Sequence, residues 1–405
     1  MRLNILAFAI PLFVTFILLE YFIARKKKLD YFHLQNSFAN ISIGIAERLL
    51  DVFTTGIFFF VYDFLHSHFA IFKINAGILL WVLLLICTDF VWYWYHRLAH
   101  EINIFWAVHV VHHQSEDFNY TVSARITVFQ AVVRTGFWCI LPVIGFPPAM
   151  ITSMLLVHGL YPFFIHTRLI GNLGILEYIL VTPSHHRVHH ASNEEYLDKN
   201  YGDVFIIWDK LFGTFKKEAP GEEIVYGLTK PLNSYSFLWQ HFHFVIEIYF
   251  AVRKADNWKK KLQIIFGKPG QIDPAIRNTA EKIYLSDKRQ APQQEKLNRY
   301  VIWQLGITLV TLFVFILFEK NIDGYLQLSF VLIVLLTLTN CGAIMEQKKW
   351  IVYLEFARLC IVVMTITFEY PNVWVLFIAL LAAILLISFF RTFQTHYLQL
   401  VYRTR

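Results

Sequence analysis

Long apolar runs alternate with short polar segments along most of the chain. As a helix, a run of about 20 apolar residues crosses a hydrocarbon core of roughly 30 Å. An apolar stretch at 127–166 is interrupted by Arg134 and several prolines, so it fits either two short spans or one re-entrant hairpin. Apart from that stretch, we expect transmembrane helices at roughly residues 4–23, 41–65, 74–95, 300–318, 325–345, 351–369 and 371–390.

The composition agrees with this pattern. Hydrophobic residues make up 57% of the chain, charged residues only 16%, and the mean hydropathy is +0.48. These values lie outside the range of soluble globular proteins. The first apolar run has its positive charges after it and no small-residue cleavage site, so we expect a retained anchor rather than a secretory signal. The sequence therefore predicts an all-α fold, a polytopic integral membrane helical bundle.

The basic residues predict an orientation. Lys and Arg beside short loops stay on the cytoplasmic side, and a basic run at 25–28 follows the first span directly. We therefore expect the N-terminus outside, and the chain near residue 96 and the C-terminus in the cytoplasm. The net charge of +7 suits loops that face anionic lipid. Because no basic segment is large or separate, we expect no nucleic-acid partner.

Four regions follow from the composition along the chain. The segment rich in Pro, Gln, Lys and Arg before the last spans suits an exposed connection or short amphipathic helices. Four cysteines lack paired spacing, which excludes a disulfide framework or an iron–sulfur motif. The predicted regions are N-terminal membrane spans at 1–95, a histidine-rich catalytic region at 96–252, a polar linker at 253–299 and a C-terminal four-span block at 300–405.

Histidines gather in three tight motifs, HRLAH, HVVHH and HRVHH. On a helix, residues three or four apart share one face, so each motif projects its imidazoles in one direction. Neutral imidazole binds iron, zinc and copper, and eight imidazoles would fill most of the coordination of two metals. The predicted ligands are His96, His100, His109, His112, His113, His186, His189 and His190.

The first motif continues the helix of the third predicted span, just past an aromatic segment at 92–95. Aromatic residues are enriched where a span meets the membrane surface. The second motif begins only nine residues after His100, so the two motifs can face each other across a short turn. We therefore expect a dimetal site at the cytoplasmic end of the bundle, where the tail of an apolar substrate could lie between the spans.

The spacing HxxxH, HxxHH, HxxHH in a membrane setting resembles the fatty acid hydroxylase and sterol desaturase superfamily of integral membrane dimetal oxygenases. Within it, the chain is most similar to the alkylglycerol monooxygenases, pterin-dependent enzymes that cleave ether lipids. The C-terminal spans also fit this subfamily. One segment, ARITVFQ at 124–130, departs from the Arg-Gln pair expected after the second motif, which bears on substrate identity rather than on metal binding. The resemblance is carried by residues 96–125, 165–193, 199–215 and 225–236.

The resemblance implies that the eight clustered histidines are the core ligands. Relatives often add histidines from the helix between the second and third motifs. His166 is the first candidate, either as a ligand or as a buried, hydrogen-bonded side chain, followed by His158 and His185. We expect His158 to be structural. The remaining histidines, which we expect in solvated or interfacial positions, are His33, His66, His68, His241, His243 and His396.

Acidic residues near the motifs have two interpretations. Glu101 follows His100 directly, and the resemblance implies a catalytic role, either as a partner that orients an imidazole or as a proton relay. A solvated glutamate at the membrane surface is the alternative. Asp203 and Asp209 follow the third motif closely and could cap or orient it.

The sequence therefore predicts a membrane di-iron monooxygenase. The resemblance implies hydroxylation of the alkyl carbon next to a glyceryl ether oxygen by O2, which releases a fatty aldehyde and a glycerol derivative. Iron is implied by the resemblance, since zinc accepts the same ligands. Because no dinucleotide-binding or haem motif is present, electrons must come from an external donor, for which the resemblance implies tetrahydrobiopterin.

Two other functions fit the same motifs. One is a fatty acid, sterol or carotenoid hydroxylase or desaturase. The other is a histidine-rich membrane protein that binds or transports metals. Transport ligands normally line a path near the middle of the bilayer, whereas these motifs flank the spans on one side.

Overall fold

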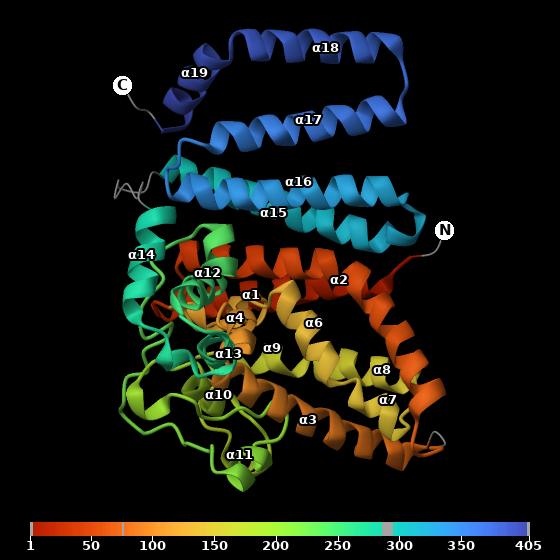
Figure 1. Ribbon diagram of the computed structural model, residues 1–405, viewed down its shortest axis with the longest axis vertical. Coiled ribbons are helices and arrows are strands. Elements are labelled where there is room, and N and C mark those ends of the chain that lie inside the picture. Colours follow the sequence, from red (N-terminus) through yellow and green to blue (C-terminus); the bar gives the residue numbers. More distant parts are fainter. Residues whose placement is uncertain (1–2, 75–76, 286–294, 403–405) are drawn as a thin grey trace. The chain divides into compact units, whose positions relative to one another are not determined.

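In the computed structural model, which describes residues 3–74, 77–285 and 295–402, nearly all regular secondary structure is helical (Figure 1). The described residues form no β-strand. They contain only isolated bridges, between Leu180 and Phe205 and between Ala191 and Tyr226. The predicted all-α fold is confirmed.

The chain divides into two compact units. The larger unit comprises Phe13–Asn233 and Trp239–Ser286, and the smaller comprises Met1–Leu12, Ser234–Leu238 and Asp287–Arg405. In the segment predicted as a polar linker, the structure contains two short helices, and residues 286–294 of that segment lie outside the described part of the chain.

Most of the larger unit consists of helices of very different lengths. Four of them have 18 or more residues, and the others are shorter segments joined by turns and loops. Its helices are α1 (Ala9–Lys26, which begins in the smaller unit), α2 (Leu34–Phe69), α3 (Ile78–Glu101), α4 (Asn103–His109), α5 (Tyr120–Ser123), α6 (Val128–Phe137), α7 (Ile140–Ile144), α8 (Pro148–His158), α9 (Tyr161–Ile165), α10 (Pro183–His189), α11 (Ile207–Phe212), α12 (Phe237–Lys254, which begins in the smaller unit), α13 (Trp258–Phe266) and α14 (Pro274–Tyr284).

In the described part of the smaller unit, five α-helices follow one another from residue 295 to residue 402. In it, α16 packs along α17 and α15 packs along α16 (Figure 1). Glu355 of α17 accepts hydrogen bonds from Arg358 (2.6 Å) and from Asn340 of α16 (2.6 Å). A half-buried charge is thereby paired among apolar helices. The helices are α15 (Glu295–Phe318), α16 (Gly324–Met345), α17 (Ile351–Glu369), α18 (Val373–Ser388) and α19 (Phe390–Tyr402).

Several helices are long and apolar enough to cross a membrane, as the hydropathy pattern predicts. Two bent pairs also qualify: the halves of α2, which are inclined by 53°, and α18 with α19, inclined by 82°. In the interrupted stretch 127–166, only the second half is long enough, and Val128–Ile144 is a shorter apolar helical segment. The six single candidates are Ile5–Lys26, Ile78–Glu101, Pro148–Ile165, Glu295–Asn321, Gly324–Met345 and Ile351–Glu369.

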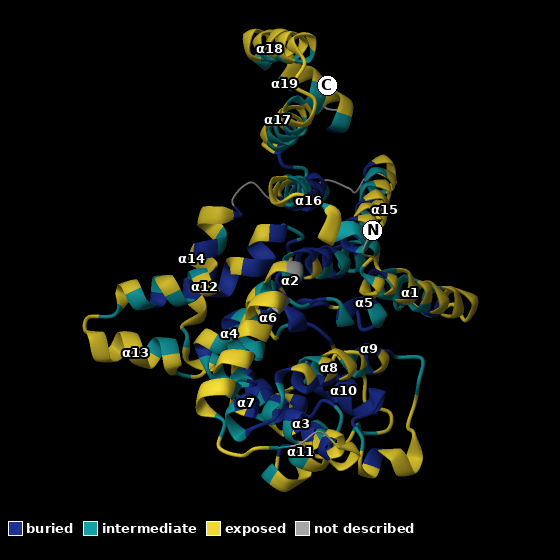
Figure 2. Ribbon diagram, turned by 90° about the vertical axis from the view of Figure 1, so that its right-hand side faces the viewer, coloured by how far each residue is buried: buried dark blue, intermediate teal, exposed yellow. Residues whose placement is uncertain are grey.

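The helix α3 supplies five of the twelve buried residues of one apolar core, and Figure 2 shows buried residues in dark blue around the labels α3 and α10. Its buried residues pack against α6, α7 and α8, where Trp138, Leu141 and Ile151 contribute to the same apolar core. The helix ends at Glu101, Ile102 follows with an extended backbone, and α4 then folds back against α3. This turn brings the first and second histidine motifs together.

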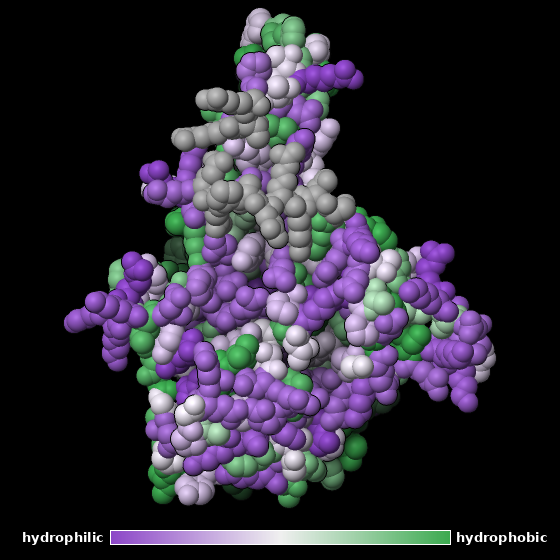
Figure 3. Space-filling model, turned by 90° about the vertical axis from the view of Figure 1, so that its left-hand side faces the viewer, coloured by the Kyte–Doolittle hydropathy of each residue, from purple (hydrophilic) through white to green (hydrophobic). Residues whose placement is uncertain are grey.

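Polar side chains gather on one face of the larger unit. Figure 3 shows mostly hydrophilic residues on the face that carries the loops between α10 and α14. On α13, the apolar and basic residues segregate, and none of its residues is buried. The polar segment predicted after residue 253 therefore contains one exposed helix, α13, whereas α14 buries Ile276, Arg277 and Ala280.

Candidate metal centre

The structure gathers nine histidines into two groups in the larger unit. In each group, one ring nitrogen from every member lies within 4.8 Å of the corresponding atoms of the others. Every member is buried, with 8% or less of its surface exposed. Group A contains His96, His100, His109, His113 and His189, and group B contains His112, His166, His186 and His190.

Short helices and turns position the nine rings. The end of α3 supplies two histidines and α4 one, and a single 3-10 turn at His112–Gln114 supplies one to each group. His166 follows α9 directly, and α10 with its C-terminal cap supplies the third motif. Because the turn and α10 each contribute to both groups, the groups share their supporting backbone.

The Nε2 atoms converge within each group. In group A, the His96 and His109 Nε2 atoms are 3.0 Å apart, and those of His100 and His113 are 3.2 Å apart. In group B, His166 Nε2 lies 2.9 Å from that of His186 and 3.2 Å from that of His112. Several ring lone pairs directed at one point repel one another unless they share a cation or a proton, so both donor sets fit a bound metal ion.

Backbone carbonyls hold the other ring nitrogen of several members. His96 Nδ1 lies 2.8 Å from the Tyr201 carbonyl oxygen, and His189 Nδ1 lies 2.9 Å from that of Lys199. His112 Nδ1 lies 3.3 Å from the carbonyl oxygen of Arg125. When Nδ1 donates its proton to a carbonyl, the lone pair remains on Nε2, the atom that faces the group.

Burial also favours the neutral form of these rings. Desolvation lowers the pKa of His166 to about 4. Neutral imidazole is the form that binds metal ions. Desolvation likewise lowers the pKa values of the other clustered histidines outside the candidate spans well below their usual value, namely those of His109, His112, His113, His186, His189 and His190.

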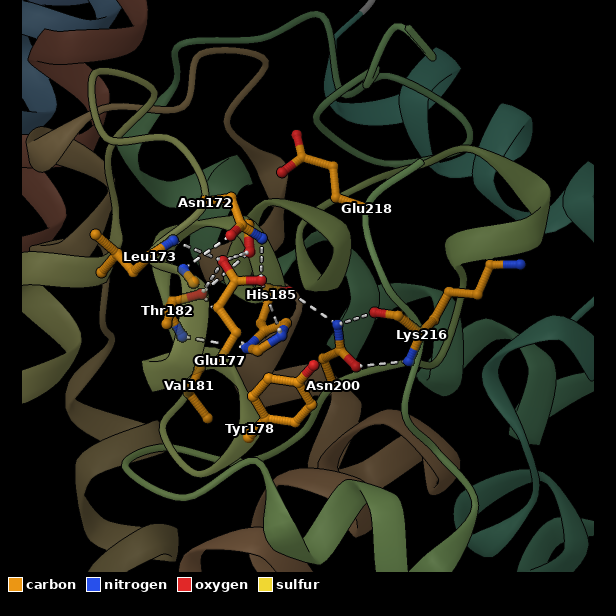
Figure 4. Close-up of polar contacts among 12 residues, drawn as sticks. Asn172, Leu173, Glu177, Tyr178, Val181, Thr182, His185, Asn200, Lys216 and Glu218 are labelled. Atoms are coloured by element: carbon orange, nitrogen blue, oxygen red, sulfur yellow. Dashed lines mark hydrogen bonds and ion pairs between the residues drawn. The ribbon is translucent and has the colours of Figure 1, made fainter. Parts of the chain in front are cut away.

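A polar network fixes α10 (Figure 4). Glu177 accepts hydrogen bonds from Ser184 Oγ (2.6 Å) and Thr182 Oγ1 (3.1 Å), at the start of the helix. Thr182 and His185 form a capping box, in which each side chain pairs with the backbone of the other. His185 thus belongs to neither group; its ring lies 4.0 Å from Glu177. Asn200 adds a bond to the His185 carbonyl oxygen (3.0 Å).

Asp209 supports the loop behind His96. Its buried carboxylate accepts hydrogen bonds from the backbone N–H groups of Tyr201 (2.7 Å) and Gly202 (2.8 Å) and from Thr214 Oγ1 (2.7 Å). Burial is the largest influence on the pKa of Asp209 and raises it to about 6, against these bonds. Because the Tyr201 carbonyl contacts His96, Asp209 helps to orient that ring through the loop.

Asp203 contacts a different histidine. His158 is buried between two carboxylates, with Nε2 3.1 Å from Asp89 and Nδ1 2.9 Å from Asp203. These three side chains could themselves hold an ion. The two ring nitrogens of His158 face separate carboxylates, an arrangement that ties α8 to α3 and to the loop after Gly202.

Glu101 lies at the edge of group A rather than inside it. Its carboxylate accepts a hydrogen bond from Arg97 (2.9 Å), one turn earlier on α3, and its side chain is 32% exposed. Arg97 in turn donates to the Tyr93 hydroxyl (3.2 Å). Glu101 therefore follows His100 in sequence but is paired with Arg97 and belongs to neither histidine group.

Two buried residues were not expected from the sequence. The prediction that His241 and His243 are solvated or interfacial is wrong, since both are buried. His243 shares a face of α12 with Glu247, and its Nδ1 lies 3.3 Å from Gln114 Nε2. Whether these two histidines are buried depends on which sides of α12 pack inward. The absence of a partner motif in the sequence gives no information about which sides those are.

Arg125 is a further residue whose role the sequence did not predict. It is buried, and its guanidinium donates to the Val111 carbonyl (2.5 Å), Gln114 Oε1 (2.5 Å) and Asn40 Oδ1 (2.9 Å). These bonds clamp the turn that carries His112 and its neighbour. Desolvation lowers the pKa of Arg125 to about 9. The available signal was the position of Arg125 in the segment 124–130, after the second motif.

Comparisons with known proteins agree with this geometry. The fatty acid hydroxylase family pattern matches residues 81–214, which hold all nine histidines. A human alkylglycerol monooxygenase is 34% identical over 86% of this chain and 80% of its own length. That of Xenopus tropicalis is 32% identical over 85% of this chain and 78% of its own length.

A more distant relative is an ornithine lipid hydroxylase of Rhizobium tropici, 29% identical over 40% of this chain and half of its own length. No solved structure matches the chain significantly. The matches to the human and frog relatives cover most of both sequences, whereas the match to the bacterial hydroxylase covers less than half of this chain. The chain therefore belongs to the alkylglycerol monooxygenase family.

Proposed function

We propose that this protein uses two irons bound by groups A and B to hydroxylate the alkyl carbon next to the ether oxygen of a glyceryl ether lipid. Family membership makes the chain a multi-pass membrane lipid monooxygenase. The observation that carries the proposal is the convergence of nine buried histidine ring nitrogens, one from each residue, into two groups. The identities of the ligands, the metal and the electron donor are parts of the proposal.

Iron fits these groups because all their donors are imidazoles and leave coordination positions open. With five and four nitrogens, neither group completes six-coordination, which leaves positions for oxygen. When bound, the two irons would supply the oxidising chemistry that inserts one atom of O2 into a C–H bond while two electrons and two protons convert the other atom to water. Zinc would bind similarly but has no redox chemistry.

The chain itself contributes positioning and protection. Carbonyl oxygens hold the Nδ1 atoms of His96 and His189, so that the rings cannot turn away from the site. Burial of both groups excludes bulk water from the reacting carbon. The hydroxylated product is a hemiacetal, which breaks its C–O bond to give a fatty aldehyde and the free glycerol hydroxyl.

We propose tetrahydrobiopterin as the external electron donor, on the basis of the family resemblance. We also propose that the N-terminus lies outside and that the histidine groups and the C-terminus face the cytoplasm, because the basic run at 25–28 follows the first span. Accessibility tags after Lys28 and at the C-terminus test this orientation. A C-terminal tag that is labelled from outside would show that the orientation is wrong.

The test of the reaction is product analysis with the purified protein in lipid vesicles. Hexadecyl glyceryl ether, isotopically labelled O2 and tetrahydrobiopterin are added to protein reconstituted with iron or, as a control, with zinc. We expect labelled hexadecanal only with iron. Formation of an unsaturated lipid would instead indicate a desaturase, and metal binding without lipid-dependent oxygen uptake would indicate a metal-binding or transport protein.

A further inference from the structure

A set of buried polar atoms beside group A has no hydrogen-bond partner among the residues that the structure describes. Three of these atoms belong to α3, at positions four and three residues apart, which places them on one face of the helix. The others belong to α6, which packs against α3, and to α4. The atoms are Thr88 Oγ1, Trp92 Nε1, Tyr95 OH, Gln130 Oε1, Arg134 Nε and His109 Nδ1.

Ring contacts join the main members of this set. The Arg134 guanidinium lies 5.8 Å from the centre of the Trp92 ring and 5.6 Å from that of Trp138. The Trp92 and Tyr95 ring centres are 5.7 Å apart. Indole faces stabilise the charge of the guanidinium, but they do not accept all its N–H groups in the way oxygen acceptors would.

Acidic side chains of the same bundle are paired elsewhere in the described part of the chain. Glu47 pairs with Arg48, while Asp89 and Asp203 pair with His158. Arg134 therefore forms no ion pair within the described residues. A buried polar atom without a partner costs free energy, and this fold places several in one region. A bound ligand or water would recover that cost.

The set directly adjoins the metal centre. The Trp92 ring centre lies 5.6 Å from that of His96, and the Tyr95 ring centre lies 6.4 Å from that of His109. In a glyceryl ether, the attacked carbon is bonded to the ether oxygen, which is itself bonded to glycerol. The glycerol hydroxyls must therefore lie only a few bonds from the reacting carbon, and so close to the metals.

We infer that Trp92, Tyr95, Gln130 and Arg134 form a subsite that binds the glycerol hydroxyls of the substrate. This hydroxyl subsite rests on the proposed function. A hydroxyl both donates and accepts hydrogen bonds, and the subsite offers donors at Trp92 and Arg134, an acceptor at Gln130 and both at Tyr95. A phosphate would use only the donors and leave Gln130 Oε1 without a partner.

Two lipids with the same chain and ether bond separate hydroxyl recognition from tail binding. Hexadecyl glyceryl ether carries both hydroxyls, whereas hexadecyl propyl ether carries none. Binding to the iron-loaded protein is measured by competition with a fluorescent lipid, without oxygen or reductant. We expect the wild-type protein to bind the glyceryl ether about tenfold more tightly, as a net gain of roughly one hydrogen bond implies.

Tyr95→Phe and Gln130→Leu should bring this ratio close to one. Tyr161→Phe is the matched control, because the Tyr161 hydroxyl donates to the Val181 carbonyl (2.6 Å) and should leave the ratio unchanged. Tyr95→Phe removes an unpaired buried hydroxyl, so the ligand-free variant should have an equal or higher Tm and a full metal content. A fall of the affinity ratio to about one in this variant would then not be caused by unfolding.

Each other outcome is decisive. A wild-type ratio near one, or an unchanged ratio in both variants, would show that water alone pairs these atoms and would overturn the subsite. Tighter binding of hexadecyl glycerophosphate than of the glyceryl ether, lost in Arg134→Met, would overturn it in favour of phosphate recognition. A wild-type preference for the glyceryl ether without aldehyde formation under turnover conditions would refute the proposed reaction and leave the subsite standing.

Discussion

Replacement of His166 by alanine tests whether the protein holds two separate metals. His166 is a member of group B alone, where its Nε2 lies 2.9 Å and 3.2 Å from those of His186 and His112. The change leaves three donors in group B and five in group A. Loss of a partner outside the coordination sphere already costs about 10- to 100-fold in affinity. Loss of a direct donor should exceed that, which corresponds to more than about 2.7 kcal/mol at group B.

The assay is metal content after dialysis against a weak chelator, measured by mass spectrometry together with Tm. We expect about two irons in the wild-type protein and about one in His166→Ala, with turnover lost. His185→Ala is the matched control, since His185 is equally buried and adjacent to the proposed ligand His186 but faces Glu177. It should lower Tm through its lost cap and retain both irons. Two tightly held irons in His166→Ala would refute the assignment of group B.

Three further changes probe the surroundings of the site. Asp209→Ala leaves two buried backbone N–H groups without an acceptor, at about 1–3 kcal/mol each, so denaturant unfolding should show a loss of about 2–6 kcal/mol that the exposed Asp256→Ala does not. Burial raises the pKa of Glu247 from 4.5 to about 7, so between these two pH values the folded protein keeps a proton that the unfolded chain loses, and the free energy of unfolding of the wild-type protein falls by up to about 3 kcal/mol as pH rises. Glu247→Gln should therefore gain stability relative to wild type in scans from about pH 5 to about pH 8, and equal slopes of unfolding free energy against pH in the two proteins would contradict this. Glu101→Gln should keep its metals and Tm but lose about 10- to 100-fold in turnover, whereas wild-type turnover would leave Glu101 with only its ion pair to Arg97.

The spans could be predicted because their information is local. Each apolar run is long enough to cross a bilayer by itself, and Gly324–Met345 and Ile351–Glu369 follow the predicted ranges within a few residues. The sequence left two alternatives for the stretch 127–166, two short spans or one re-entrant hairpin, because its prolines can interrupt a helix. The structure makes Pro148–Ile165 a candidate span, with Pro148 in the first turn, where proline requires no lost hydrogen bond.

The histidines could be identified from the sequence, but their division into two groups could not. Spacing shows that His109, His112 and His113 lie on one short segment, yet His112 belongs to group B and the other two to group A. The division depends on which ring faces which neighbour across the bundle. The same is true of Arg125, because its partners lie up to 115 residues away in the chain.

The shared backbone of the two groups explains why His166 is the informative position. The turn at 112–114 and helix α10 each supply both groups, so a change there can disturb both metals through the backbone alone. His166 instead follows α9 and is held by the Pro162 carbonyl, 2.5 Å from its Nδ1. Replacement of the His166 side chain by a methyl group removes one donor from group B and leaves the turn at 112–114 and helix α10 in place. Selective loss of one metal is therefore the result that two histidine sites require, whereas a single shared site would lose both metals or neither.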